Sequence, residues 1–120
     1  MQYALLIYAD ESTWESAPDG VRRETLERYA QLNRDLRGEG RLLAGEELRP
    51  VATATAVRVR DGETLVSDGP FAETKEALGG FYVVEADSLD EAIEWAARIP
   101  AAAAGTVEVR PVADHSGNGA

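Results

Sequence analysis

Two segments of this chain are apolar on both of their alternating faces, and they constrain the fold more than any other feature. In residues 3–8 (YALLIY) and 81–84 (FYVV), odd and even positions alike carry apolar side chains. A strand with one solvated face alternates apolar with polar side chains, so both segments are expected to be central strands of a sheet that is covered on both sides. The fold must therefore supply two covering layers.

Two amphipathic helices are predicted to form one of these layers. In residues 21–37, apolar side chains recur at three- and four-residue steps, and glycines follow at 38 and 40. The predicted buried stripe of this helix is Leu26, Tyr29, Leu32 and Leu36. A second helix is expected to begin at the Ser-x-x-Glu capping box of residues 88–91 and to end at Pro100, with Trp95 on its flank. Its predicted stripe is Leu89, Ala92, Ile93, Ala96 and Ile99.

Turn residues and alternation predict the remaining elements. Residues 41–48 and 106–112 are expected to be strands. Residues 55–60 and 63–67 alternate on either side of Asp61-Gly62, a pair that suits the positive φ angles of a type I′ turn, so they predict a β-hairpin. The Asp-Gly-Pro-Phe sequence at 68–71 predicts a turn, and residues 72–78 are expected to form one or two helical turns.

The order of these elements predicts an α+β fold, a ferredoxin-like βαββαβ sandwich with an inserted β-hairpin. Residues 1–112 are expected to form the single domain and residues 113–120 a disordered tail. Right-handed crossovers place both helices on the same face of the sheet. We therefore expect a second copy to cover the other face, as a homodimer.

Charge and composition exclude several classes of partner and site. The net charge of -10, from 22 acidic and 12 basic residues, repels phosphate backbones and anionic lipids, so neither nucleic acid nor a membrane is an expected partner. The apolar start ends at Asp10, too early for a signal or membrane segment. The absence of cysteine excludes thiolate chemistry and agrees with a cytoplasmic location. No cofactor is predicted.

Residues 57–78 (VRVRDGETLVSDGPFAETKEAL), the GGFYVVEADSLDEAIEWAARIP segment that follows and the closing VEVRPV together resemble the YCII-related family, in particular its branch with the Asp-Gly-Pro-Phe motif. The resemblance covers residues 1–112 and implies a dimeric α+β barrel. It also implies an association of some members with extracytoplasmic-function sigma factors. Many members pair a histidine on the first helix with an aspartate, whereas this chain has Tyr29 there and its one histidine, His115, near the C-terminus.

Carboxylates and tyrosines are the remaining candidates for chemistry. Asp68, before the Gly-Pro turn, is the candidate catalytic acid or base, although an aspartate at this position also serves to bond the N–H groups of its own turn. The candidate substrate-binding residues are Tyr8, Tyr29, Phe71, Glu73 and Lys75. Each has a structural alternative, as core packing or as a solvated surface. No metal site is predicted, because the acidic pairs at 10–11 and 46–47 lack the spacing of a cation-binding loop.

Two functions follow from these observations. The first is a small-molecule-binding domain with a pocket near Asp68, Phe71 and Tyr29, and the sequence leaves open whether it is an enzyme. The second is a non-catalytic interaction or regulatory module, with a sigma factor as a candidate partner. A pocket with convergent polar groups favours the first function, and a solid core with an exposed apolar patch favours the second.

Overall fold

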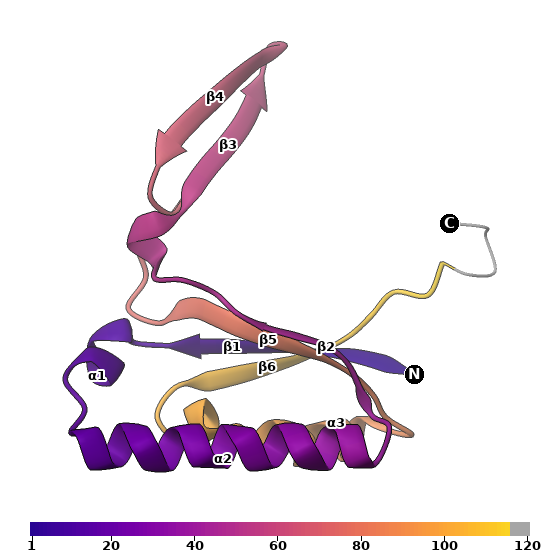
Figure 1. Ribbon diagram of the computed structural model, residues 1–120. Helices are drawn as coiled ribbons and strands as arrows, with labels where there is room; N and C mark the ends of the chain where they lie inside the picture. Colours follow the sequence, from indigo (N-terminus) through magenta and orange to yellow (C-terminus); the bar gives the residue numbers. More distant parts are fainter. Residues whose placement is uncertain (116–120) are drawn as a thin grey trace.

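An antiparallel four-stranded sheet, with its two longer helices α2 and α3 on one face, forms the body of the protein in the computed structural model, which describes residues 1–115 (Figure 1). The strands lie in the order β2-β5-β1-β6. In chain order the elements are β1 (Gln2–Ala9), α1 (Glu11–Glu15), α2 (Asp19–Gly38), β2 (Leu42–Glu47), η1 (Val51–Thr53), β3 (Thr55–Arg60), β4 (Glu63–Asp68), β5 (Ala77–Glu85), α3 (Leu89–Ala97), η2 (Pro100–Ala103) and β6 (Thr106–Pro111).

The two segments that are apolar on both faces are the two central strands, β1 and β5, as predicted. They pair antiparallel, with Leu5 opposite Tyr82 and Leu6 opposite Phe81. β2 and β6 pair with them at the two edges. This order and the placement of α2 and α3 on one face are those of a ferredoxin-like α+β fold, which confirms the predicted fold class.

The core lies between the sheet and the helices. Most of its side chains come from the two central strands and from α2 and α3, and Ile99 follows α3. The largest fully buried ones are Leu5, Leu32, Leu36, Val84 and Ile99. The buried face of α3 consists of Ala92, Trp95 and Ala96, and Trp95 is only 6% exposed although it was expected on the flank.

Three residues of the predicted helical stripes are exposed instead: Leu26 on α2 and Leu89 and Ile93 on α3. At 100° per residue, Leu26 points about 90° away from the mean direction of Tyr29, Leu32 and Leu36. On the same basis Leu89 and Ile93 point about 70° and 110° away from the buried face of α3. Both predicted stripes were therefore too wide.

The predicted β-hairpin is confirmed. β3 and β4 pair with each other alone, and their two-residue turn has positive φ at both Asp61 (51°) and Gly62 (76°), as a type I′ turn requires. We call residues 55–68 the arm, because they project from the sheet on the side opposite to the helices (Figure 1). The radius of gyration is accordingly 16.6 Å, above the value of about 13.5 Å expected for a compact chain of this length.

Between the arm and β5, the structure contradicts the prediction of helical turns over 72–78. Residues 72–76 are irregular and β5 begins at Ala77. Gly79 and Gly80 lie within β5, and Gly80 approaches β2 so closely that an added Cβ would lie 2.9 Å from the Glu46 carbonyl oxygen. The short helix α1 was not predicted, because five residues are too few to show helical periodicity; Asp10 caps it by accepting from the Ser12 N–H at 3.0 Å.

Among the described residues, no α-helix covers the other face of the sheet, and we call it the helix-free face (Figure 1). Its centre is apolar and incompletely buried, and consists of Ala4, Leu6 and Tyr8 on β1 and Leu78, Phe81 and Val83 on β5. Within the described residues, no helix is both long and apolar enough to cross a membrane. The predicted tail, 113–120, continues beyond the described part of the chain, and its first three residues are exposed and outside any strand or helix.

Candidate functional site

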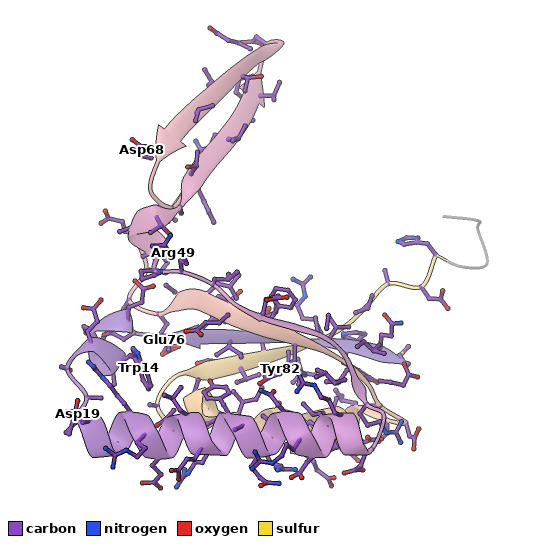
Figure 2. All side chains as sticks on the ribbon, in the orientation of Figure 1. Trp14, Asp19, Arg49, Asp68, Glu76 and Tyr82 are labelled. Atoms are coloured by element: carbon purple, nitrogen blue, oxygen red, sulfur yellow. The ribbon has the colours of Figure 1, made fainter. Side chains whose placement is uncertain are left out.

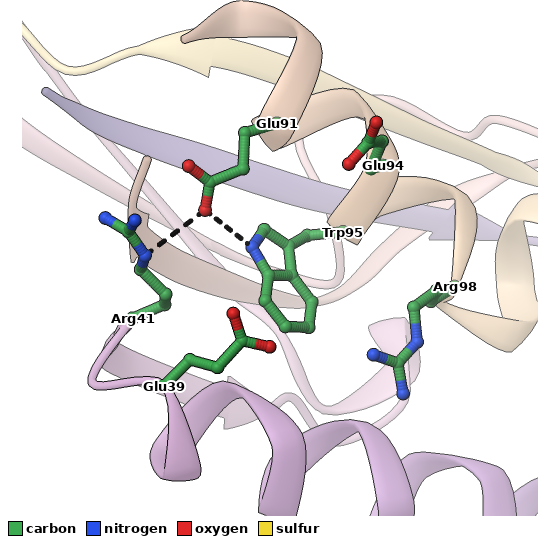
Figure 3. Close-up of a pocket in the computed structure, with 6 residues that line it drawn as sticks. All are labelled: Glu39, Arg41, Glu91, Glu94, Trp95 and Arg98. Carbon is green, nitrogen blue, oxygen red and sulfur yellow. Dashed lines mark hydrogen bonds and ion pairs between the residues drawn. The ribbon is translucent and has the colours of Figure 1, made fainter. Parts of the chain in front are cut away.

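Two pockets can be compared as candidate sites. The first, which we call the α3 groove, is lined by Glu39, Arg41, Glu91, Glu94, Trp95 and Arg98 (Figure 3). The second, which we call the arm-base pocket, is lined by Val51, Ala52, Pro70, Ala72, Glu73, Thr74 and Ala77. They have similar volumes, about 310 and 360 Å³. Their polar groups differ, and this difference decides between them.

In the α3 groove three of the polar side chains, Arg41, Glu91 and Trp95, bind one another. Glu91 Oε2 lies 3.2 Å from Arg41 Nε and accepts from Trp95 Nε1 at 3.1 Å (Figure 3). The two terminal nitrogens of the Arg41 guanidinium donate to Asp87, Nη1 to Oδ1 at 3.2 Å and Nη2 to Oδ2 at 3.0 Å. These bonds hold the pKa of Asp87 below its usual value and raise the pKa of Arg41.

The second arginine of the groove, Arg98, is also neutralised. It donates to Asp35 at 2.5 Å and lies over the Trp95 ring, 5.3 Å from its centroid. Because both guanidinium groups are paired, neither is free to bind an anion. The groove is therefore a structural network that ties α3 to the end of α2 and the start of β2.

The arm-base pocket lies where the arm joins the sheet, and most of its walls are apolar. The short helix η1 forms one wall of this pocket. A residue of α1 holds η1 in place, because Glu11 Oε2 accepts from the Val51 N–H at 3.0 Å. The Thr74 hydroxyl donates to the Glu76 carbonyl oxygen at 2.7 Å. Glu73, by contrast, makes no hydrogen bond or ion pair within the described part of the chain, so it offers a free carboxylate to an apolar pocket.

The predicted site residues fall into separate groups. Glu73 lines the arm-base pocket. Lys75 lies close enough to Asp10 to help lower its pKa, although hydrogen bonds from Ser12 contribute more to this shift. Phe71 is 80% exposed.

Asp68 ends β4 at the base of the arm, where its side chain is exposed (Figure 2). Its carboxylate accepts no hydrogen bond within the described residues. The predicted bonds to its own turn are therefore not formed. The base of the arm is closed instead by the Gly69 N–H, which donates to the Ala54 carbonyl oxygen at 2.7 Å, and Gly69 adopts a φ of 90°.

The two candidate tyrosines lie on opposite sides of the sheet. Tyr29 packs against the core, and burial raises its pKa. Its neighbour Tyr82 donates its hydroxyl to Asn33 Oδ1 at 2.7 Å. Tyr8 lies on the helix-free face, opposite Leu78 and Thr106. A single chain thus does not unite Tyr29 with Asp68 and Phe71 in one pocket.

Sequence reasoning identified only Glu73 as a site residue of the arm-base pocket and missed the other lining residues, which are Val51, Ala52, Pro70, Ala72, Thr74 and Ala77. Pro50 signals a turn after β2, but no residue pattern indicates that this turn folds against residues 70–77. Glu11 was considered only as a potential cation ligand and is instead the side chain that holds the turn. The described residues contain no cluster of three or more histidine, aspartate or glutamate side chains that could hold a metal ion.

Comparison with known proteins adds the family to this geometry. Residues 1–116 match the YCII-related domain. The chain belongs to the YCII-related family. An uncharacterised protein of Rhizobium meliloti is 39% identical over 115 residues, which are 94% of this chain and 93% of that relative. The predicted YCII-related family is therefore confirmed, whereas its Asp-Gly-Pro-Phe branch stays a prediction. The similarity to the relative covers 94% of this chain.

Proposed function

We propose that this YCII-related protein binds a small molecule in the arm-base pocket and that it does so as a homodimer. The observation that carries the proposal is the free carboxylate of Glu73 on an otherwise mainly apolar wall. A pocket of this kind favours a ligand with an apolar body and one cationic or hydrogen-bond-donating group. The α3 groove also presents an unpaired carboxylate within the described residues, that of Glu94, but it stands among charged side chains rather than on an apolar wall.

The helix-free face supports the homodimer. Six apolar side chains occupy its centre, and four of them come from the middle of the two central strands. Stacked sheets pack about 10 Å apart through such faces, and a two-fold pair would bury both copies of the same face. This arrangement is the second covering layer that the sequence requires.

We further propose that the chain belongs to the branch of the family with the Asp-Gly-Pro-Phe motif, and that Asp68 acts as an acid or base if the protein is an enzyme. In a single chain its carboxylate faces water. A carboxyl group acquires a catalytically useful pKa mainly through burial or a charged neighbour. Catalysis by Asp68 therefore requires a second protomer or a ligand to cover it.

A regulatory module, with a sigma factor as its partner, is the second candidate function. The exposed apolar side chains of the helix-free face and the arm favour it, because such patches mark interaction surfaces. A self-complementary sheet face is equally suited to a second copy. The two candidates differ in whether the protein binds a small molecule at all.

A thermal-shift screen against a metabolite library tests the proposal. A ligand at 100 times its Kd stabilises the folded protein by about 2.7 kcal/mol and raises Tm. We expect a compound that stabilises the wild type, fails with Glu73→Gln and still acts on Glu94→Gln, whose carboxylate lines the α3 groove. The proposal would be overturned if no compound stabilised the wild type, or if the stabilising compounds raised the Tm of Glu73→Gln by the same amount. Loss of turnover but not of binding in Asp68→Asn would identify the catalytic group.

A further inference from the structure

We infer that the arm is a docking element for a second copy of this chain, which it contacts through a valine-rich face. The inference rests on the proposed homodimer and extends it, because it assigns to each protomer a segment that reaches across the interface. The argument depends on the chemistry of the arm, its length, the area available for association and its charge.

The two faces of the arm differ in chemistry. The strand register places Val57 opposite Val66, Val59 opposite Thr64 and Thr55 opposite Asp68, all on one face. We call this the valine face. The three valines are 61%, 58% and 65% exposed, for Val57, Val59 and Val66 respectively. The opposite face pairs Arg60 with Glu63 and Arg58 with Leu65.

The arm packs on no other strand or long helix among residues 1–115. Its strands are hydrogen-bonded only to each other, and they stand clear of the sheet (Figure 1). A two-stranded ribbon is marginally stable in water unless another element covers it. The exposed valine face is therefore expected to be buried in the functional assembly.

The direction and length of the arm identify the surface that it meets. The arm rises on the helix-free side, where the second protomer of the proposed dimer would lie (Figure 1). Each arm strand has six residues, which span about 20 Å, whereas stacked sheets are about 10 Å apart. The arm is thus too long to end between the two sheets, and it must pass along the flank of the partner.

The area required by a stable dimer also indicates that the arms take part in the interface. Four strands about 4.8 Å apart, paired over about 20 Å, give the helix-free face a footprint of about 400 Å². A stable interface buries about 800 Å² on each partner. One face of the arm supplies about 200 Å², and the flank that receives the partner's arm supplies a similar area. Two exchanged arms therefore make up the difference.

Charge also permits the contact. The arm carries two arginines against three acidic residues, a net charge of -1, so the remainder of the chain carries -9 of the total of -10. A nearly neutral element approaches an acidic partner with little repulsion. Arg58 makes no ion pair within the described residues and remains available for a carboxylate of the partner.

Docking through the valine face has a consequence for Asp68, which shares that face. Burial of the three valines against a partner would also withdraw the Asp68 carboxylate from bulk water. The arm exchange thus supplies the covering that a catalytic Asp68 requires, and the proposed active form becomes the dimer with both arms docked.

The absence of cysteine makes a direct test possible. Val66→Cys and Leu65→Cys place a benzophenone-maleimide label on the valine face and on the opposite face of the same strand. Each labelled protein is irradiated in a mixture with unlabelled, ¹⁵N-enriched wild type, and mass spectrometry identifies the crosslinked peptides. We expect crosslinks between protomers from position 66, at a yield several times that from position 65. Crosslinks confined to one chain, or equal yields, would overturn the inference.

A mutational test separates failure of the arm from failure of the dimer. Val57→Asp/Val66→Asp should weaken association at least tenfold in sedimentation, whereas Leu65→Asp/Ser67→Asp, with the same added charge on the opposite face, should change it little. Leu6→Glu, on the helix-free face, should yield monomers. If Leu6→Glu dissociates the dimer and the valine variants do not, the arm inference fails alone. If the wild type is a monomer at micromolar concentration, the proposed dimer fails and the arm inference with it.

Discussion

At the scale of single residues, Gly105 is the described glycine at which an added Cβ would have the least space. It precedes β6, and a Cβ there would overlap the carbonyl oxygen of Tyr8 and lie 3.1 Å from the Cα of Ala9. Its N–H donates to the Ala101 carbonyl oxygen at 2.6 Å, which limits any shift away from β1. Glycine is required at position 105 because there is no space for a Cβ. The atoms in the way belong to the backbone of β1, which cannot move aside as a flexible side chain can.

We predict that Gly105→Ala lowers the free energy of unfolding by about 1–3 kcal/mol, the usual effect of overpacking. Urea unfolding followed by circular dichroism measures it. Gly79→Ala is the matched control, because a Cβ at Gly79 meets nothing within 4 Å. Equal effects of the two substitutions would contradict the importance of the contact with β1.

Asp87 provides a prediction about pH. Hydrogen bonds from Arg41 hold its pKa below the usual 3.8. A group with a lowered folded-state pKa stabilises the protein above its unfolded pKa, and this contribution is lost as the pH falls through the folded-state value. We therefore expect Asp87→Asn to be less stable than wild type at pH 7, with a difference that shrinks below about pH 4. Urea midpoints at pH 7 and pH 3 measure it, and a difference that is independent of pH would contradict it.

At the scale of elements, the start of α3 combines a predicted cap with an unexpected partner. The Ser88 hydroxyl accepts from the Glu91 N–H at 3.1 Å, as the capping box predicts. Glu91 Oε1, however, accepts from the N–H of Asp87 at 2.8 Å rather than from that of Ser88. Its other oxygen serves Arg41 and Trp95, so Glu91 links the cap to the core.

Ser88→Ala should therefore destabilise the protein by about 1 kcal/mol through the loss of the cap. Thermal unfolding monitored at the helical circular dichroism band provides the measurement. Ser67→Ala, at an exposed position on the arm without a capping role, should leave Tm unchanged. A loss of the same size in both variants would show that the hydroxyl of Ser88 does not act as a cap.

Elements governed by local rules could be predicted from the sequence. The Asp61-Gly62 turn depends only on two φ angles, and the Ser88 cap on groups three residues apart. The two central strands were identified because their composition already reflects two covered faces. The exposure of Leu89 and Ile93 could not be predicted, since it depends on the direction from which α3 meets the sheet.

The candidate site was less predictable because it, too, depends on how distant elements pack together. Glu73 was identified and lines the arm-base pocket, but the residues facing it come from the turn after β2. The pairing of that turn with residues 70–77 follows from the tertiary path of the arm. Tyr29 was assigned to the same pocket as Asp68 because sequence spacing does not reveal that the sheet separates α2 from the arm.

At the scale of the whole molecule, net charge opposes self-association while the apolar faces favour it. Two copies at -10 each repel one another, and this repulsion is screened within about 10 Å at 0.1 M salt. Apolar burial is not weakened by screening. The balance between these two terms therefore depends on ionic strength.

We predict that raising sodium chloride from about 50 to 500 mM tightens the proposed dimer several-fold, because the Debye length falls to a few ångströms over this range. Sedimentation equilibrium at a series of concentrations measures the dissociation constant. A dimer that weakens with salt would mean that ion pairs, such as those available to Arg58, outweigh the general repulsion.

The way the arm is attached has a consequence for how this fold can evolve. Thr55 and Asp68 are cross-strand partners, and the bond between Gly69 and Ala54 closes the chain just below them. The rest of the fold therefore meets only two adjacent chain ends at this point. We therefore expect that a segment whose ends lie equally close could replace the arm without disturbing the core. The site is thus suited to grafted peptides or whole inserted domains, and partner choice can diversify there while the sheet and helices stay the same.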